Sequence, residues 1–140
     1  MADCVFCVIV EGVSAHFVHE GPLVVAFLDH APLIPGHVLV APRAHHETLD
    51  EMPDQLLAPV FGLVQRVSRA QRAALGADGS LTMVNTRISQ SVPHAHVHVV
   101  PRHRNDGLFR SGMVWIRRRY REGEAAEIAA RLRTAISASD

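Results

Sequence analysis

The 140-residue sequence has no long apolar run, no net charge and only two cysteines, and each of these features excludes a class of protein. No apolar stretch approaches the ~20 residues that a membrane-spanning helix needs. The first residues carry no basic segment before a long apolar one, so we expect no secretory signal peptide and a cytoplasmic protein. Basic and acidic residues number 14 each, which argues against duplex nucleic acid as the main partner.

The two cysteines, Cys4 and Cys7, are separated by two residues. In a reducing compartment this spacing indicates a metal site or a redox pair more than a structural disulfide. The alternative is a pair of free cysteines, one of which packs inward.

Positive charge clusters at two places despite the zero net charge. Arg102 and Arg104 follow a run of histidines and could help to attract an anion. The second cluster is interpreted as solvated surface and consists of Arg117, Arg118, Arg119 and Arg121.

Apolar residues make up 48% of the chain and charged residues 20%, which is a globular composition. We expect one domain over residues 1–140, with a C-terminal tail of about residues 103–140 that contains a helix. Two apolar segments, Leu23–Asp29 and His37–Ala41, predict strands. The short turn between them, at Pro35-Gly36, favours antiparallel pairing.

The segment Pro53–Leu75 has apolar residues at spacings of three and four, which predicts an amphipathic helix. Pro59 lacks a backbone donor and predicts a kink or a delayed start, and Gly76 is a natural stop. Glu122–Ser137 shows the same periodicity and predicts a second helix.

Further strands are predicted at Leu81–Asn85 and Val92–Val100, and Ser14–Glu20 could add an edge strand. Thr86–Ser91 is polar and predicts a loop. Since strands, a helix and more strands follow one another without βαβ alternation, the sequence predicts an α+β fold. Its mainly antiparallel sheet would have about five strands, with one long helix and a C-terminal helix.

Histidine is unusually frequent, with 10 copies, and His94, His96 and His98 alternate. On a strand these three side chains would point to one face, while Ala95 and the residues that alternate with them would enter the core. Three imidazoles on one face could bind a metal or contact an anionic substrate. A neutral imidazole is a good nucleophile toward phosphorus, and its phosphoramidate is reactive enough to be hydrolysed. The alternative is three histidines on a solvated strand face.

The segment Gln90–Arg102 (QSVPHAHVHVVPR) resembles the histidine-triad (HIT) superfamily, whose pattern alternates histidine with hydrophobic residues. Phe27-Leu28-Asp29 and the segment from Pro35 to Pro42 resemble the earlier strands of the family. The resemblance implies a HIT-like fold and a bacterial HIT-domain nucleotide hydrolase. Thr86–Ser89 departs from the family, which often has a glycine-rich stretch there, and Arg87 could supply a charge that glycines do not.

The resemblance also implies roles for individual residues. His96 would attack the α-phosphorus and form a nucleotidyl-histidine, His98 would contact the phosphate, and His94 would support the site. Residues implied to bind substrate are Phe6, Phe27, Asp29, His37, Asn85, Gln90 and Ser91, with Ile9 and Leu28 beside the base. His37 would lie behind His96 or His98. Asp29 would accept the ribose hydroxyls, although it could instead cap a turn, and the apolar residues could be ordinary core.

Some members of the family pair an N-terminal cysteine pair with two histidines, which implies a structural zinc site at Cys4, Cys7, His45 and His94. His46 is a competing candidate for the third ligand. Four protein ligands would leave no open position for water.

Three functional hypotheses remain open on the sequence. The first is a hydrolase or transferase that acts on the 5′-phosphoryl group of a dinucleoside polyphosphate or a nucleoside phosphoramidate. The second is a non-catalytic AMP- or zinc-binding regulatory module, and the third is a hydrolase that uses the histidines as metal ligands. Asn105–Leu108 and Trp115 resemble bacterial HIT hydrolases and, more distantly, the dinucleoside polyphosphate branch. The resemblance further implies a homodimer and no organic cofactor.

Overall fold

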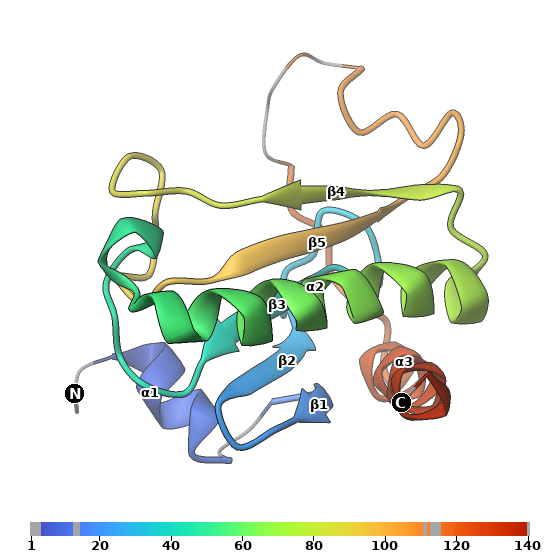
Figure 1. Ribbon diagram of the computed structural model, residues 1–140. Coiled ribbons are helices and arrows are strands. Elements are labelled where there is room, and N and C mark those ends of the chain that lie inside the picture. Colours follow the sequence, from blue (N-terminus) through green and yellow to red (C-terminus); the bar gives the residue numbers. More distant parts are fainter. Residues whose placement is uncertain (1–3, 13–14, 111, 113–115, 140) are drawn as a thin grey trace.

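The computed structural model describes residues 4–12, 15–110, 112 and 116–139, and its centre is a five-stranded antiparallel sheet (Figure 1). The strand order is β1-β2-β3-β5-β4. The strands are β1 (Phe17–Glu20), β2 (Val24–Leu28), β3 (Val38–Pro42), β4 (Gly79–Met83) and β5 (Val97–Arg102). The predicted α+β fold with a mainly antiparallel sheet is confirmed.

The described part of the chain contains three α-helices and one short 3₁₀ turn. They are α1 (Val5–Val10), η1 (Leu49–Glu51), α2 (Asp54–Leu75) and α3 (Glu124–Ala138). The long helix α2 ends at Gly76, which adopts the left-handed conformation, as predicted. The helix already begins at Asp54, so the delayed start expected from Pro59 is wrong; the buried apolar face stabilises the helix despite the missing donor.

The two faces of the sheet carry separate apolar clusters. Alternate residues of β2, such as Val24 and Ala26, pack with β3, β5, α2 and α3 in the larger cluster. The intervening residues Val25 and Phe27 face the other way and pack with α1. This alternation is the two-residue period of a strand, and it separates the helical core from the face where the histidines lie. Figure 1 shows α2 crossing the sheet, with α3 beside it.

The sequence did not predict α1, whose six residues are too few to show helical periodicity. Several strand boundaries also differ from expectation. β4 begins at Gly79 rather than Leu81, because its partner β5 extends to Arg102 and the two strands pair to that point. Ser14, the first residue of the possible edge strand, lies outside the described residues.

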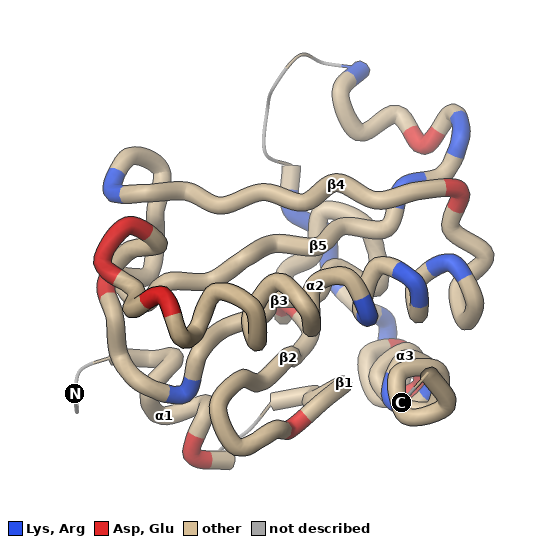
Figure 2. The backbone as a smooth tube through the Cα atoms, in the orientation of Figure 1, with Lys and Arg blue, Asp and Glu red and all other residues tan. Residues whose placement is uncertain are grey.

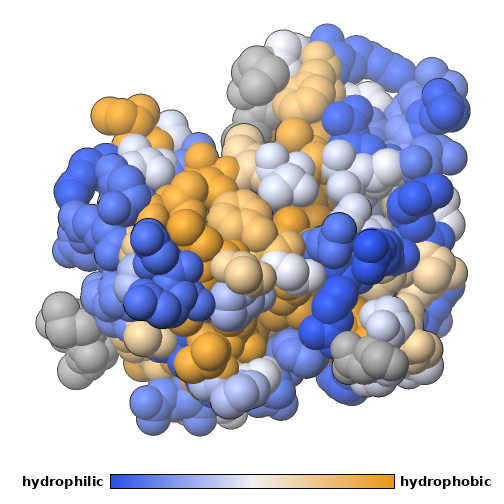
Figure 3. Space-filling model, in the orientation of Figure 1, coloured by the Kyte–Doolittle hydropathy of each residue, from blue (hydrophilic) through white to orange (hydrophobic). Residues whose placement is uncertain are grey.

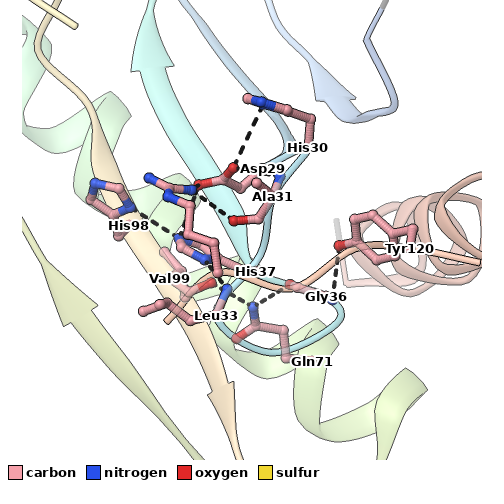
Figure 4. Close-up of polar contacts among 11 residues, drawn as sticks. Asp29, His30, Ala31, Leu33, Gly36, His37, Gln71, His98, Val99 and Tyr120 are labelled. Atoms are coloured by element: carbon pink, nitrogen blue, oxygen red, sulfur yellow. Dashed lines mark hydrogen bonds and ion pairs between the residues drawn. The ribbon is translucent and has the colours of Figure 1, made fainter. Parts of the chain in front are cut away.

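The loop between β2 and β3 is held in place by hydrogen bonds from two sides (Figure 4). The Gly36 N–H donates to the hydroxyl of Tyr120 at 3.1 Å, and the Gly36 carbonyl accepts from Nε2 of Gln71 at 3.0 Å. The φ of Gly36 is +100°, and a Cβ there would lie 2.5 Å from Cδ1 of Leu75. Only glycine fits this turn, and the turn fixes the flanking residues Asp29 and His37.

Candidate functional site

A cavity of about 720 Å³ opens on the face of the sheet that α1 partly covers. One part of its wall is apolar and includes Phe6, Ile9, Phe27, Leu28, Leu39 and Val92. A second part is polar and includes Asp29, Ser91, His96 and His98. The C-terminal segment closes a third part with Arg117, Arg119, Tyr120 and Arg121. An apolar slot beside hydrogen-bonding groups suits a ligand with an aromatic end and an anionic end.

The histidine run is not one continuous strand, and this part of the prediction is wrong. β5 begins at Val97, so only His98 lies on it. After Pro93, the N–H of His94 donates to the carbonyl of Val92 at 2.8 Å, and the N–H of Ala95 donates to the carbonyl of His46 at 2.7 Å. These bonds replace the ladder that a strand would need and turn the chain before it enters the sheet.

As a result the three imidazoles divide between two sites. The rings of His96 and His98 lie 4.9 Å apart between centroids, and both line the cavity. The ring of His94 turns toward Cys4, Cys7 and His45. The expectation that Ala95 enters the core is confirmed.

Nδ1 of His96 lies 2.6 Å from the carbonyl oxygen of His94. Because a carbonyl can only accept, Nδ1 carries the proton, and Nε2 of the neutral ring has the lone pair. The ring of Phe6 lies edge-on to this imidazole, 4.8 Å away between centroids, and only 7% of His96 is exposed. Burial lowers the pKa of His96, which favours the neutral form. The arrangement presents a buried imidazole nitrogen with an available electron pair.

His98 belongs to a short relay of hydrogen bonds (Figure 4). The backbone N–H of Leu33 donates to Nδ1 of His37 at 3.1 Å, and Nε2 of His37 lies 2.9 Å from Nδ1 of His98. Since Nδ1 of His37 accepts, its Nε2 must donate, and His98 then carries its own proton on Nε2. Burial lowers the pKa of His37 to about 4 and that of His98 to about 3. Both rings are therefore neutral near pH 7, and His98 is a donor through Nε2.

Asp29 is 3% exposed and follows the end of β2. Its Oδ1 accepts the N–H of Ala31 at 3.0 Å, so the turn-capping role is present. Its Oδ2 accepts from Arg117 at 2.8 Å and lies 3.7 Å from Nε2 of His37. Burial alone would raise the pKa of Asp29, but His37, the Ala31 N–H and Arg117 together lower it. The carboxylate is ionised and keeps further acceptor positions toward the cavity, so capping and ligand binding are compatible.

The loop before the histidines takes a backbone that glycine would favour. Arg87 has a φ of 65° and Ser89 a φ of 62°, so non-glycine residues hold the left-handed conformation here. The side chain of Gln90 ties this loop together: its Oε1 accepts the Arg87 N–H, and its Nε2 donates to the carbonyls of Glu47 and Val92. The charge of Arg87 pairs with Glu51. Of this loop, Ser91 lines the cavity.

Cys4, Cys7, His45 and His94 form a second cluster, in which one ligand atom from each residue lies within 4.8 Å of the others. Nδ1 of His45 is 3.2 Å from Sγ of Cys7, and Nδ1 of His94 is 3.5 Å from Sγ of Cys4. Bond lengths of tetrahedral zinc place S and N about 3.5 Å apart. Nε2 of His94 donates to the Pro42 carbonyl at 2.8 Å, which leaves Nδ1 as the metal-facing lone pair.

The residues of this cluster therefore fit a four-coordinate zinc ion. His46, the competing candidate, is absent from the cluster within the part of the chain that the structure describes. Instead, the backbone carbonyl of His46 accepts a hydrogen bond from the Ala95 N–H.

The structure brings most of the predicted substrate residues to one cavity. Phe6, Phe27, Asp29, Ser91, His96 and His98 line it, as do Ile9 and Leu28. His37 lies behind His98, while Asn85 and Gln90 are outside the cavity wall as the described residues define it. Trp115 lies outside the described residues.

All four residues of the second arginine cluster are exposed, as expected, but three of them also line the cavity, which the sequence did not predict. Arg102 pairs with Asp106 at 2.7 Å and neither it nor Arg104 is part of the cavity wall among the described residues. Arg117, in contrast, forms an ion pair with the buried carboxylate of Asp29. In the sequence, the alternation of Arg117 and Arg119 was the one sign that both side chains could face the same side. No local sequence pattern, however, indicates that this segment lies against the cavity.

Comparison with known proteins gives a consistent picture. The HIT domain family model matches residues 11–105. An adenosine 5′-monophosphoramidase of Schizosaccharomyces pombe is 36% identical over 103 residues, which are 71% of this chain and 74% of that protein. An adenylylsulfatase of Arabidopsis thaliana is 36% identical over 112 residues, 78% of this chain and 57% of that protein.

A solved structure of a zinc-bound histidine triad family protein from Mycobacterium smegmatis matches with a TM-score of 0.86 and 34% identity. The match covers 99% of this chain and 96% of that one. Among the residues described, no helix has the length and apolar character needed to cross a bilayer.

Proposed function

The chain belongs to the histidine-triad (HIT) family, and from this premise we propose that it hydrolyses nucleotides at the α-phosphorus through a nucleotidyl-His96 intermediate. The observation that carries the proposal is the hydrogen bond from Nδ1 of His96 to the His94 carbonyl, which leaves Nε2 as the nucleophilic atom. Relatives named as an AMP phosphoramidase and an adenylylsulfatase support nucleotide hydrolysis in general.

In the first step, Nε2 of His96 attacks the α-phosphorus and the bond to the leaving group breaks. The leaving group departs with the electron pair, as an amine that takes up a proton or as a phosphate oxyanion. The Nε2–H of His98, fixed by His37, donates to a phosphate oxygen and stabilises the charge that develops there. Ser91, on the same cavity wall, supplies a hydroxyl donor.

In the second step, water attacks the same phosphorus and the N–P bond breaks. The nucleoside monophosphate leaves with the hydroxyl of the water, and the remaining proton goes to solvent. His96 returns to its neutral form with the proton on Nδ1. Splitting one displacement into two lowers each barrier.

The rest of the cavity suits the nucleoside. Phe6 and Phe27 lie in edge-to-face contact, 5.4 Å apart between centroids, and with Ile9 they provide an apolar slot for a base. We assign Asp29, which lines the same cavity, to the ribose hydroxyls.

We also propose that the Cys4, Cys7, His45 and His94 cluster holds a structural zinc ion. The donor set and distances above fit the ion, and the similar M. smegmatis protein is zinc-bound. The ion would supply a crosslink between the N-terminal helix and the His94 turn, with all four positions filled by protein.

A homodimer is a further part of the proposal. β4 is one of the two edge strands of the sheet, and Leu57 and Phe61, one turn apart on α2, are 37% and 38% exposed. Figure 3 shows hydrophobic side chains gathered on the face where α2 lies. An exposed strand edge beside apolar side chains is a surface that a second copy can cover.

The test is to incubate the purified protein with adenosine 5′-phosphoramidate and with diadenosine polyphosphates and to measure AMP. We expect release of AMP, and His96→Gln should reduce it by ~10³-fold or more. Denaturation at alkaline pH during turnover, which preserves the N–P bond, should show wild-type protein heavier by one AMP adduct, and the variant should show none. Absence of turnover together with tight AMP binding by calorimetry would indicate the regulatory module instead. Loss of activity after brief chelation, with the fold intact, would indicate metal-dependent chemistry.

A further inference from the structure

The segment that leads from residue 116 into α3 forms neither helix nor strand and carries arginines at alternate positions. Figure 2 shows basic positions along this segment, between the grey trace and α3. Arg117, Arg119 and Arg121 line the cavity, whereas Arg118 is absent from its described wall. The N–H of Arg118 donates to the Pro32 carbonyl at 2.7 Å, which fixes the segment against the β2–β3 loop. Three of the four arginines therefore share the cavity side of this segment.

Two of these arginines are held by acids. NH1 of Arg117 donates to Oδ2 of Asp29 at 2.8 Å and to the Ala31 carbonyl at 2.7 Å. NH2 of Arg121 donates to Glu124 at 3.3 Å. The guanidinium of Arg117 therefore stands beside the carboxylate that we assign to the ribose.

Arg119 lies between them in sequence and has no hydrogen bond or ion pair with any residue in the described part of the chain. Arg119 thus brings to the cavity a positive charge that no acid in the described part of the chain balances. The small residues Gly123, Ala125 and Ala126 line the same cavity and take up little of its space. A guanidinium fork matches phosphate geometry well.

We propose that Arg119, beside Arg117, forms a second phosphate subsite, separate from the His96–His98 position that receives the α-phosphate. This inference rests on the proposed function. Its ligands are adenine nucleotides with a second phosphate group. That group could come from the 5′-chain beyond the α-phosphorus or from a phosphate on the ribose, since Arg117 of the same segment binds Asp29, the residue that we assign to the ribose.

The experiment is calorimetric binding of three probes that give no turnover: AMP, the α,β-methylene analogue of ADP, and adenosine 3′,5′-bisphosphate. We expect at least one bisphosphate to bind about tenfold more tightly than AMP, the gain typical of one charge-assisted contact. The probe that gains identifies the source of the second phosphate. Arg119→Gln should abolish the gain and leave the dissociation constant of AMP within about twofold.

Arg118→Gln is the matched control, because it removes the same charge from the adjacent position and should keep the gain. The inference is overturned if neither bisphosphate binds better than AMP, or if both variants lose the gain equally. If AMP itself does not bind, the proposed function fails and this inference fails with it. Binding of AMP without any gain overturns the second subsite alone.

Discussion

Nε2 of His37 and Nδ1 of His98 lie 2.9 Å apart, and this contact joins the β2–β3 loop to strand β5. The loop is in turn fixed by Leu33, whose N–H donates to the other nitrogen of His37. The backbone N–H of Leu33 thus determines, through His37, which nitrogen of His98 carries the proton. A hydrogen-bonded relay of this kind sets both the tautomer and the orientation of the ring that contacts substrate.

Removing the His37 donor should impair catalysis through His98. We expect His37→Phe to lower kcat by about 10- to 100-fold with little change in KM, because the Nε2–H of His98 is no longer fixed. His37→Gln, which can still donate to Nδ1 of His98, should recover much of the loss. Equal activity of wild type and His37→Phe, with both proteins folded by circular dichroism, would contradict the positioning role.

The same two histidines make stability depend on pH. Burial lowers the pKa of His37 to about 4 and of His98 to about 3, both below the value of 6.5 in the unfolded chain. Between pH 4 and pH 6.5 the unfolded chain binds more protons at these histidines than the folded chain does. The free energy of unfolding should therefore fall as pH decreases from 6.5 toward 4. Each histidine contributes a slope of up to about 1.4 kcal/mol per pH unit.

Urea unfolding of metal-free protein between pH 4.5 and 7 measures this slope. His37→Gln should flatten it. Val67→Ala, a core variant without a titrating group, should lower stability by roughly 2 kcal/mol at every pH and leave the slope unchanged. A His37→Gln slope as steep as that of wild type would rule out this origin of the acid sensitivity.

Adjacent histidines should differ in metal binding. We expect wild-type protein to carry one zinc per chain and His45→Gln to carry much less, because Nδ1 of His45 faces Cys7. His46→Gln should keep the metal. Zinc at 100 times its dissociation constant should stabilise the fold by about 3 kcal/mol, and calorimetric melting with and without chelator measures the effect. Retention of zinc by His45→Gln would refute the ligand assignment.

The loop at Ser89 should be more stable with glycine. Ser89 holds a φ of 62°, which costs a side chain energy that glycine does not incur. Ser89→Gly should raise the free energy of unfolding by roughly 0.5–1 kcal/mol in urea titrations. Ser137→Gly, an exposed position inside α3, should lower it by a similar amount. A loss of stability in both variants would show that the left-handed backbone is not the cause.

The outer face of α2 should mediate self-association. Phe61→Glu places a charge on the exposed apolar pair of α2 and should shift the protein from dimer to monomer in light scattering. Phe109 is equally exposed at 40% but lies after β5, away from α2, and Phe109→Glu should remain dimeric. A monomeric wild type, or loss of the dimer in both variants, would exclude this interface.

Much of the fold follows from local patterns. β2, β3, α2 and α3 lie within two residues of their predicted bounds, because alternation or helical periodicity is visible over each segment. α1 was missed because its six residues, VFCVIV, resemble a strand in composition. Its helical state is stabilised by packing on Val25 and Phe27, which belong to another part of the chain.

By itself, the sequence determined the chemistry that is present: the alternating histidines, the cysteine pair and the acid after β2. The tertiary structure decided how these groups are divided. A turn after Pro93, stabilised by the distant carbonyl of His46, sends His94 to the cysteines and leaves His96 and His98 in the cavity. Arg117 likewise reaches Asp29 across 88 positions of sequence. Periodicity specifies the face of an element, but contacts between remote segments determine what that face meets.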